Sequence, residues 1–79
     1  MASHSEREEA FEAAIARLPR VAEGIAGMPP EKQSAAFAIA ERTYLETARE
    51  VGCSEEQARN WVAAVMFGLR AEVKKRQNQ

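Results

Sequence analysis

Few side chains in this 79-residue sequence could perform chemistry, and they are widely separated. His4 is the only histidine and Cys53 the only cysteine, 49 positions apart, and aspartate is absent. Metal sites need several histidine, cysteine or carboxylate ligands that converge, and calcium loops are rich in aspartate. We therefore expect neither a metal site nor a cofactor. A single cysteine also excludes an intrachain disulfide.

Cys53 and Glu41 are the remaining candidates for a reactive group. Cys53 precedes a predicted helix start, which could favour its thiolate, although a free cysteine more often acts as a small apolar side chain. Glu41 falls near an apolar helix face, where a carboxylate could be a tuned acid or base; the commoner arrangement is an ion pair, here with Arg17 or Arg70. An enzyme would require Glu41, Tyr44 and Cys53 to line one cavity. No nucleotide-binding or hydrolase motif occurs, and we predict a non-enzymatic protein.

The elements that must position these side chains belong to one small domain. Hydrophobic residues make up 46% of the sequence, but 16 of them are alanine and only five positions are aromatic. A chain of this length buries only about 60% of its unfolded surface, which excludes a Rossmann unit, a P-loop unit or a barrel. We predict a helical domain over residues 5–76, with disordered tails at 1–4 and 77–79.

The first half of the sequence predicts a helix with a weak point at Pro19. Ser5 and Glu8 have the spacing of a capping box at a helix start. An apolar stripe follows at steps of three and four residues, made of Phe11, Ile15, Leu18, Ala22 and Ile25. Pro19 interrupts the backbone hydrogen bonds inside this stripe, so the helix is either kinked or broken there.

Two long helices are predicted after Pro29. Nothing breaks a helix between Pro30 and Val51, and Gly52 stands where a helix C-terminus favours glycine. Ser54 and Gln57 form a second capping box, which starts a helix that reaches about Lys75. Its core face is predicted to consist of Ala58, Trp61, Val62, Val65, Leu69 and Val73. The turn Gly52-Cys53-Ser54 is so short that the two helices must be neighbours, and the predicted fold is an all-α bundle of three to four helices.

The last helix carries more apolar surface than three short helices can cover. Phe67 lies about 200° around the helix from Val65, and Ile39 lies about 200° from Phe37 on its own helix. We predict a homodimer interface formed by Ile39, Ala63, Met66, Phe67, Arg70 and Ala71. The alternatives are that the N-terminal segment covers Phe67 within one chain, or that a different protein binds there.

The segment 46–62 resembles the core of a helix-turn-helix motif. Ala48 and Gly52 are four residues apart, and Ala58 and Trp61 would pack the second helix. A net charge of −5 over residues 1–58 and +4 over residues 59–79 makes the C-terminal end basic. The alternative function is therefore a DNA-binding regulator that uses Arg59, Lys74, Lys75 and Arg76. Two glutamates at the start of the would-be reading helix oppose this, because they would repel phosphates.

Two further resemblances concern the fold and imply no activity. The turn at 51–58 is similar to the glycine turn of ubiquitin-associated three-helix domains, without the aromatic residue that follows the glycine there. The stretch that runs from Glu41-Arg42-Thr43-Tyr44-Leu45 to residues 65–73 resembles small bacterial all-helical proteins with no assigned activity. The resemblance covers less than half of the chain and implies a small helical fold.

No segment of the sequence has the pattern of a membrane span or a secretory signal. The longest uncharged apolar run, Trp61 to Leu69, is far shorter than the roughly 20 residues that cross a bilayer. Residues 1–6 lack the basic and apolar regions of a signal peptide. We therefore expect a cytoplasmic protein that does not bind membranes.

Overall fold

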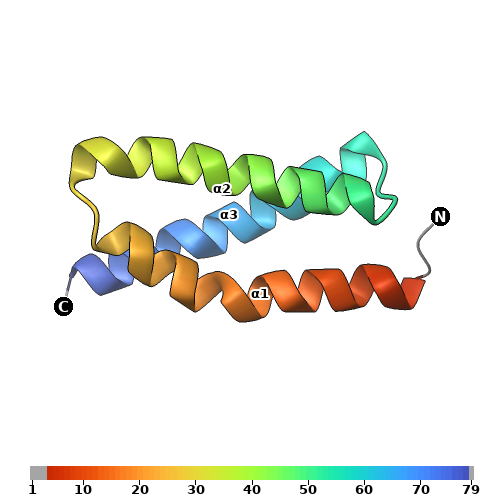
Figure 1. Ribbon diagram of the computed structural model, residues 1–79, viewed down its shortest axis with the longest axis horizontal. Helices are drawn as coiled ribbons and strands as arrows, with labels where there is room; N and C mark the ends of the chain where they lie inside the picture. The colour runs from red at the N-terminus through yellow and green to blue at the C-terminus, as the bar shows by residue number, and fades with distance from the viewer. Residues whose placement is uncertain (1–3, 79) are drawn as a thin grey trace.

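The computed structural model describes residues 4–78, which form three α-helices and no strand. Helix α1 spans His4–Ala26, α2 spans Pro30–Glu50 and α3 spans Glu55–Gln77 (Figure 1). The prediction of a small all-α bundle is confirmed. The helices begin and end slightly outside the predicted domain of residues 5–76, and the rest of the predicted tails, residues 1–3 and 79, lies outside the described residues.

Helix α1 continues through Pro19, so the predicted alternative of two separate helices is wrong, and the kink stays a prediction. Proline cannot donate a backbone hydrogen bond to the carbonyl of Ile15. Both residues are on the exposed side of α1, where water can satisfy that carbonyl, while Leu18 and Ala22 are buried on the other side. Burial of this apolar face holds both halves in one helix. The helix begins at His4, so Ser5 lies in the first turn and is not the cap.

The C-terminus of α2 is closed by glycine, as predicted. Gly52 has a φ of +87°, in the left-handed region that favours glycine. Its N–H donates to the carbonyl of Arg49 at 3.0 Å, and the N–H of Cys53 donates to the carbonyl of Ala48 at 3.1 Å. These two hydrogen bonds form a Schellman motif. They turn the chain back on itself within a few residues.

The N-terminus of α3 has the predicted capping box. The Ser54 hydroxyl accepts a hydrogen bond from the Gln57 N–H at 3.2 Å, and the Gln57 side chain accepts one from the Ser54 N–H at 3.0 Å. Arg49 donates two hydrogen bonds to the Glu55 carboxylate across the turn, at 2.8 and 3.0 Å. These hydrogen bonds lower the pKa of the Glu55 carboxyl. The connection is therefore fixed by side chains on both sides.

Helices α1 and α3 lie side by side and run parallel to each other. The ring of Phe11 stacks on Trp61 with the centroids 4.3 Å apart. Seven residues further along both helices, the end of the Leu18 side chain is 3.8 Å from where a Cβ would stand at Gly68. Equal steps along the two helices keep them in contact, so they share one direction (Figure 1).

Helix α2 runs antiparallel to both of the other helices. Tyr44 meets the edge of Trp61 with the centroids 5.9 Å apart. About two helical turns earlier in α2 and two and a half turns later in α3, the Arg70 guanidinium lies 4.7 Å from the ring centroid of Phe37. The bundle measures 41 × 19 × 15 Å. Since each helix is about 30–35 Å long, all three follow the long axis.

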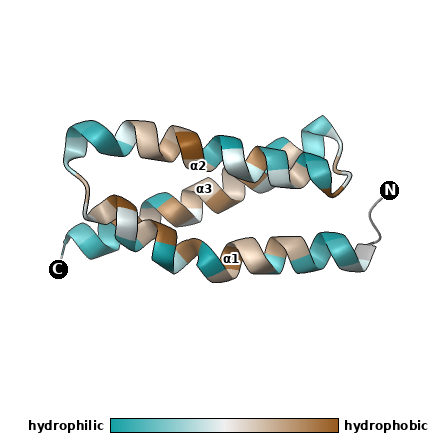
Figure 2. Ribbon diagram, viewed as in Figure 1, coloured by the Kyte–Doolittle hydropathy of each residue, from teal (hydrophilic) through white to brown (hydrophobic). Residues whose placement is uncertain are grey.

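The hydrophobic core lies along the line where the three helices meet. Figure 2 shows hydrophilic residues concentrated at the start of α1, the start of α2 and the C-terminal end of α3. The predicted core face of α3 is confirmed, with Trp61 half-buried and the other members buried. The core cluster consists of Leu18, Ala22, Ile25, Tyr44, Val62, Val65, Met66, Leu69 and Val73.

Candidate functional site

The face of α3 that points away from the other helices carries a large apolar side chain. Phe67 is 79% exposed, more than any other large hydrophobic residue that the structure describes. The residues three and four positions away on either side are exposed too. We call this row the outer stripe; it consists of Asn60, Ala64, Phe67, Ala71 and Lys74. The alternative in which the N-terminal segment covers Phe67 within one chain is therefore wrong for the described residues.

Two residues predicted to share an interface with Phe67 lie elsewhere. Ile39 is 62% exposed, but it lines a groove between α1 and α2. Met66 exposes only 5% of its surface, because it belongs to the core of its own chain. Within the described residues, the exposed neighbours of Phe67 along its helix therefore all belong to α3.

The other predicted interface residues are exposed on α3. Ala71 belongs to the outer stripe, and Ala63 lines a shallow depression between α2 and α3. Arg70 places its guanidinium over the ring of Phe37, a cation–π contact within one chain. Arg70 thus has a role inside the monomer that its position in the sequence did not indicate.

The basic residues considered for DNA binding form two groups. Arg59 is in the second turn of α3, whereas Lys74, Lys75 and Arg76 are in its last turns, about 22 Å further along the helix. Arg76 donates hydrogen bonds to the carboxylate of Glu72 at 2.6 Å and to its carbonyl at 3.2 Å. The structure does not gather these cations into one patch.

The α2–α3 connection has the shape of an antiparallel hairpin. In a DNA-binding helix-turn-helix the two helices cross at about 90–120°. Helix α2, about 31 Å long, could not lie across a molecule whose shorter dimensions are 19 and 15 Å. The would-be reading helix also buries residues from Ala58 to Val73. This geometry gives no support to the DNA-binding alternative.

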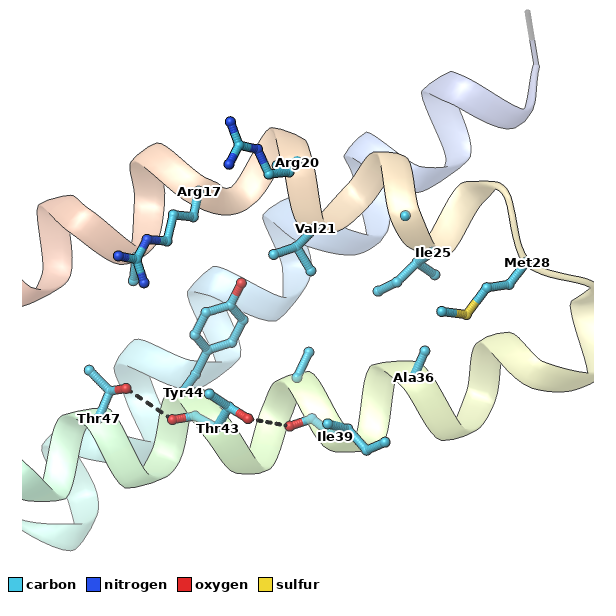
Figure 3. Close-up of a pocket in the computed structure, with 13 residues that line it drawn as sticks. Arg17, Arg20, Val21, Ile25, Met28, Ala36, Ile39, Thr43, Tyr44 and Thr47 are labelled. Carbon is cyan, nitrogen blue, oxygen red and sulfur yellow. Dashed lines mark hydrogen bonds between the residues drawn. The ribbon is translucent and has the colours of Figure 1, made fainter.

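An open groove of about 500 Å³ runs between α1 and α2, and no residue of α3 lines it (Figure 3). Its polar and apolar side chains are mostly separated along its length; the exceptions among the lining residues are Ala14, one turn before Arg17, and Arg20, next to Val21. Arg17, Thr43, Tyr44 and Thr47 lie toward one end, and apolar side chains lie toward the connection between the two helices (Figure 3). The apolar part is lined by Val21, Ile25, Met28, Ala36, Ile39 and Ala40.

Tyr44 has a buried hydroxyl without a hydrogen-bond partner among the described residues. Only 7% of the residue is exposed, and its hydroxyl points toward α1, between Arg17 and Val21 in this view (Figure 3). Burial raises the pKa of the hydroxyl, because a phenolate would lose its hydration. The group therefore stays protonated and can donate a hydrogen bond to an acceptor.

The other polar groups at this end of the groove differ in whether they can still form hydrogen bonds or ion pairs with a ligand. The hydroxyls of Thr43 and Thr47 donate to the carbonyls of Ile39 and Thr43, at 2.9 and 3.0 Å. Arg17 is exposed and has no hydrogen bond or ion pair within residues 4–78. In Figure 3 the guanidinium of Arg17 lies on the side of α1 that faces the groove, while the guanidinium of Arg20 points away from α2. Arg17 is thus the cation at the polar end.

The candidates for catalysis do not meet. Tyr44 lines the groove, Glu41 lines the depression between α2 and α3, and Cys53 is in the connection that follows α2. Neither Arg17 nor Arg70 forms the predicted ion pair with Glu41 in the described part of the chain. Within that part, no three metal-ligating side chains converge.

Comparison with known protein families, with characterised proteins and with solved structures finds no match to this chain. None of the described helices has an apolar stretch long enough to cross a membrane. Functional inference therefore depends on the outer stripe and the groove.

Sequence reasoning missed the groove and its polar end. Tyr44 was considered for chemistry only as a possible member of a cavity with Glu41 and Cys53, and Arg17 only as a partner for Glu41. Gly24 was the one feature of the sequence that could have indicated the groove. It stands between the apolar residues Ala22 and Ile25 of α1, where a larger residue would be expected. Nothing in the sequence indicated that α1 and α2 would separate on one side.

Proposed function

We propose that this protein is a non-enzymatic helical module that associates with a second copy of itself through the outer stripe of α3. The observation that carries the proposal is the 79% exposure of Phe67 at the centre of that stripe. Exposed apolar patches with polar borders are typical of protein interaction sites. Asn60 and Lys74 supply the polar ends, and the alanines between them allow a close approach of two helices.

The charges of α3 favour an antiparallel pair. Its first turn carries Glu55 and Glu56, and its last turn carries three cations. A parallel pair would bring like charges together, whereas an antiparallel pair sets each acidic end against a basic end. With Phe67 at the centre, Ala64 of one copy would face Ala71 of the other. This arrangement has the two-fold symmetry of most homodimers.

The energetics indicate a reversible dimer. Two Phe67 side chains would bury roughly 300 Å² of apolar surface, about 7 kcal/mol at the usual coefficient. The loss of rotational and translational freedom costs about 4–15 kcal/mol. Phe67 alone therefore does not supply micromolar affinity, and the alanine contacts and the opposite charges at the two ends must supply the rest. On this proposal we expect a weak dimer that is dissociated at low micromolar concentration and forms at high micromolar concentration.

Sedimentation equilibrium across this concentration range tests the proposal. Phe67→Glu should leave a monomer with unchanged helicity, since the side chain has little contact within its own chain. Ile39→Glu is the matched control, because it places the same charge at an exposed apolar position on another face. A wild-type monomer at high micromolar concentration would refute the proposal, as would equal loss of dimer in both variants.

A charge exchange tests the antiparallel orientation. Glu56→Lys and Lys75→Glu should each weaken the dimer, because each sets like charges against each other across the pair. The double variant should recover the wild-type affinity. If it dissociates as readily as the single variants, the two copies do not pair in this orientation.

A further inference from the structure

The groove between α1 and α2 has a polar end and an apolar end. Its polar groups gather at the end near Arg17 and Thr47, and its apolar side chains continue to Met28 at the helix connection (Figure 3). From Arg17 to Met28 the groove follows eleven residues of α1 and its connection, about 16 Å at the helical rise. A ligand that matches it has one polar end and an apolar body.

The polar end favours an anion. Tyr44 offers a protonated hydroxyl whose hydrogen-bonding capacity is unused in the described structure. A buried donor without a partner is costly, so an acceptor that reaches it is favoured. Arg17 adds a positive charge on the same side of α1, and its planar guanidinium suits a carboxylate.

The apolar end has free space. An added Cβ at Gly24 would meet no atom within 4 Å, and the groove of about 500 Å³ is within the usual range of small-molecule sites. Glycine inside a helix costs up to about 1 kcal/mol relative to alanine. No close packing against another helix requires glycine at this position, and its small size leaves the groove open there.

We propose that this groove binds a medium-chain alkyl carboxylate, with its carboxylate at Tyr44 and Arg17 and its chain along Ile25 toward Met28. The carboxylate accepts the hydrogen bond of the Tyr44 hydroxyl and pairs with the Arg17 guanidinium. The alkyl chain covers Ile39, whose exposure on the groove rim is otherwise unexplained. This binding is independent of self-association, because the outer stripe is on another face.

The separation of polar and apolar groups argues against a helical occupant. An amphipathic helix in a groove presents an apolar face along its whole length and turns its polar face to solvent. It would leave the polar end of this groove facing apolar side chains. A molecule with a charged head and an apolar tail satisfies both ends.

Titration of the intact protein with decanoate, below its micelle concentration, tests the proposal. Binding is followed by amide chemical shifts and by the fluorescence of Trp61, the only tryptophan, whose ring contacts Tyr44. We expect one saturable site with shifts centred on Tyr44, Ile25 and Met28. Octanoate should bind about tenfold more weakly, because it buries two fewer methylene groups.

Variants separate recognition of the head from recognition of the chain. Tyr44→Phe should weaken decanoate binding about tenfold, since it removes a hydrogen bond to a charged group. Arg17→Gln should weaken it about threefold, as expected for an exposed charge pair, whereas Arg42→Gln, on the opposite side of α2, should leave it unchanged. Gly24→Leu should abolish binding by filling the groove while the chain stays folded.

Three results would overturn the proposal. Equal binding of decanol and decanoate would show that no carboxylate is recognised. Shifts that appear only with anionic phospholipid vesicles would make the occupant a membrane surface. Shifts at the groove that depend on protein concentration without ligand, and that disappear in Gly24→Leu, would show that a second copy occupies it.

Discussion

Replacing Tyr44 with phenylalanine removes one oxygen atom from the protein and leaves the ring in its place. The ring packs edge-on against Trp61 at 5.9 Å, and this contact does not involve the hydroxyl. The oxygen is buried and has no hydrogen-bond partner in the described structure. We therefore expect Tyr44→Phe to increase the free energy of unfolding.

The size of the gain follows from the cost of burying the hydroxyl. A buried polar group without a partner costs about 1–3 kcal/mol. Tyr44 lies beside an open groove, where small movements can admit water, so we expect the lower limit of about 1 kcal/mol. For a domain of this size that corresponds to a rise in Tm of about 4–8 °C.

Thermal and urea unfolding followed by circular dichroism, at a concentration where the protein is monomeric, measure this change. Thr47→Val is the matched control, because it removes a hydroxyl that donates to the Thr43 carbonyl at 3.0 Å. We expect no stabilisation from it. A loss of 1 kcal/mol or more in Tyr44→Phe would show that the hydroxyl is hydrogen-bonded in solution, and the reasoning would be wrong.

Four further substitutions test the fold. Gly52→Ala should destabilise the protein by about 1–2 kcal/mol, because φ is +87° at this position, while Gly24→Ala in the helical, open site should stabilise it by up to about 1 kcal/mol; equal effects in urea unfolding would contradict this. Leu69→Ala should cost about 2–5 kcal/mol, because the side chain is fully buried, and a loss below 1 kcal/mol would mean that α3 packs differently. Glu55→Gln should make stability less dependent on acid pH. The lowered pKa of Glu55 means that its contribution is complete above the unfolded value of about 4.3 and is lost as the pH falls through the folded value; identical pH profiles of unfolding would show that the pair with Arg49 does not form.

The ends of α2 and α3 could be predicted because their causes are local. Gly52 supplies a backbone conformation that other residues disfavour, and Ser54 with Gln57 supplies the capping hydrogen bonds. These contacts join residues a few positions apart, so the sequence contains all of their geometry. The buried face of α3 follows for a similar reason, since helical periodicity alone selects residues such as Leu69.

Interactions between helices could not be predicted in the same way. Glu41 was expected to pair with an arginine, but Arg70 instead lies over Phe37. Met66 was assigned to an interface, although it is buried in the core of its own chain. Each outcome depends on the rotation and the offset of one helix against another, and these are set by the packing of the whole core.

By itself, the sequence determined an all-α chain, the tight turn between its last two helices, and an excess of apolar surface at Phe67. The tertiary structure decided that α1 continues through Pro19, that Phe67 and Ile39 lie on different faces, and that Tyr44 has a hydroxyl without a partner beside a groove. Local hydrogen bonds and periodicity are properties of neighbouring residues. The groove exists only because α1 and α2 both pack on α3 and separate on the opposite side, which is a property of three helices together.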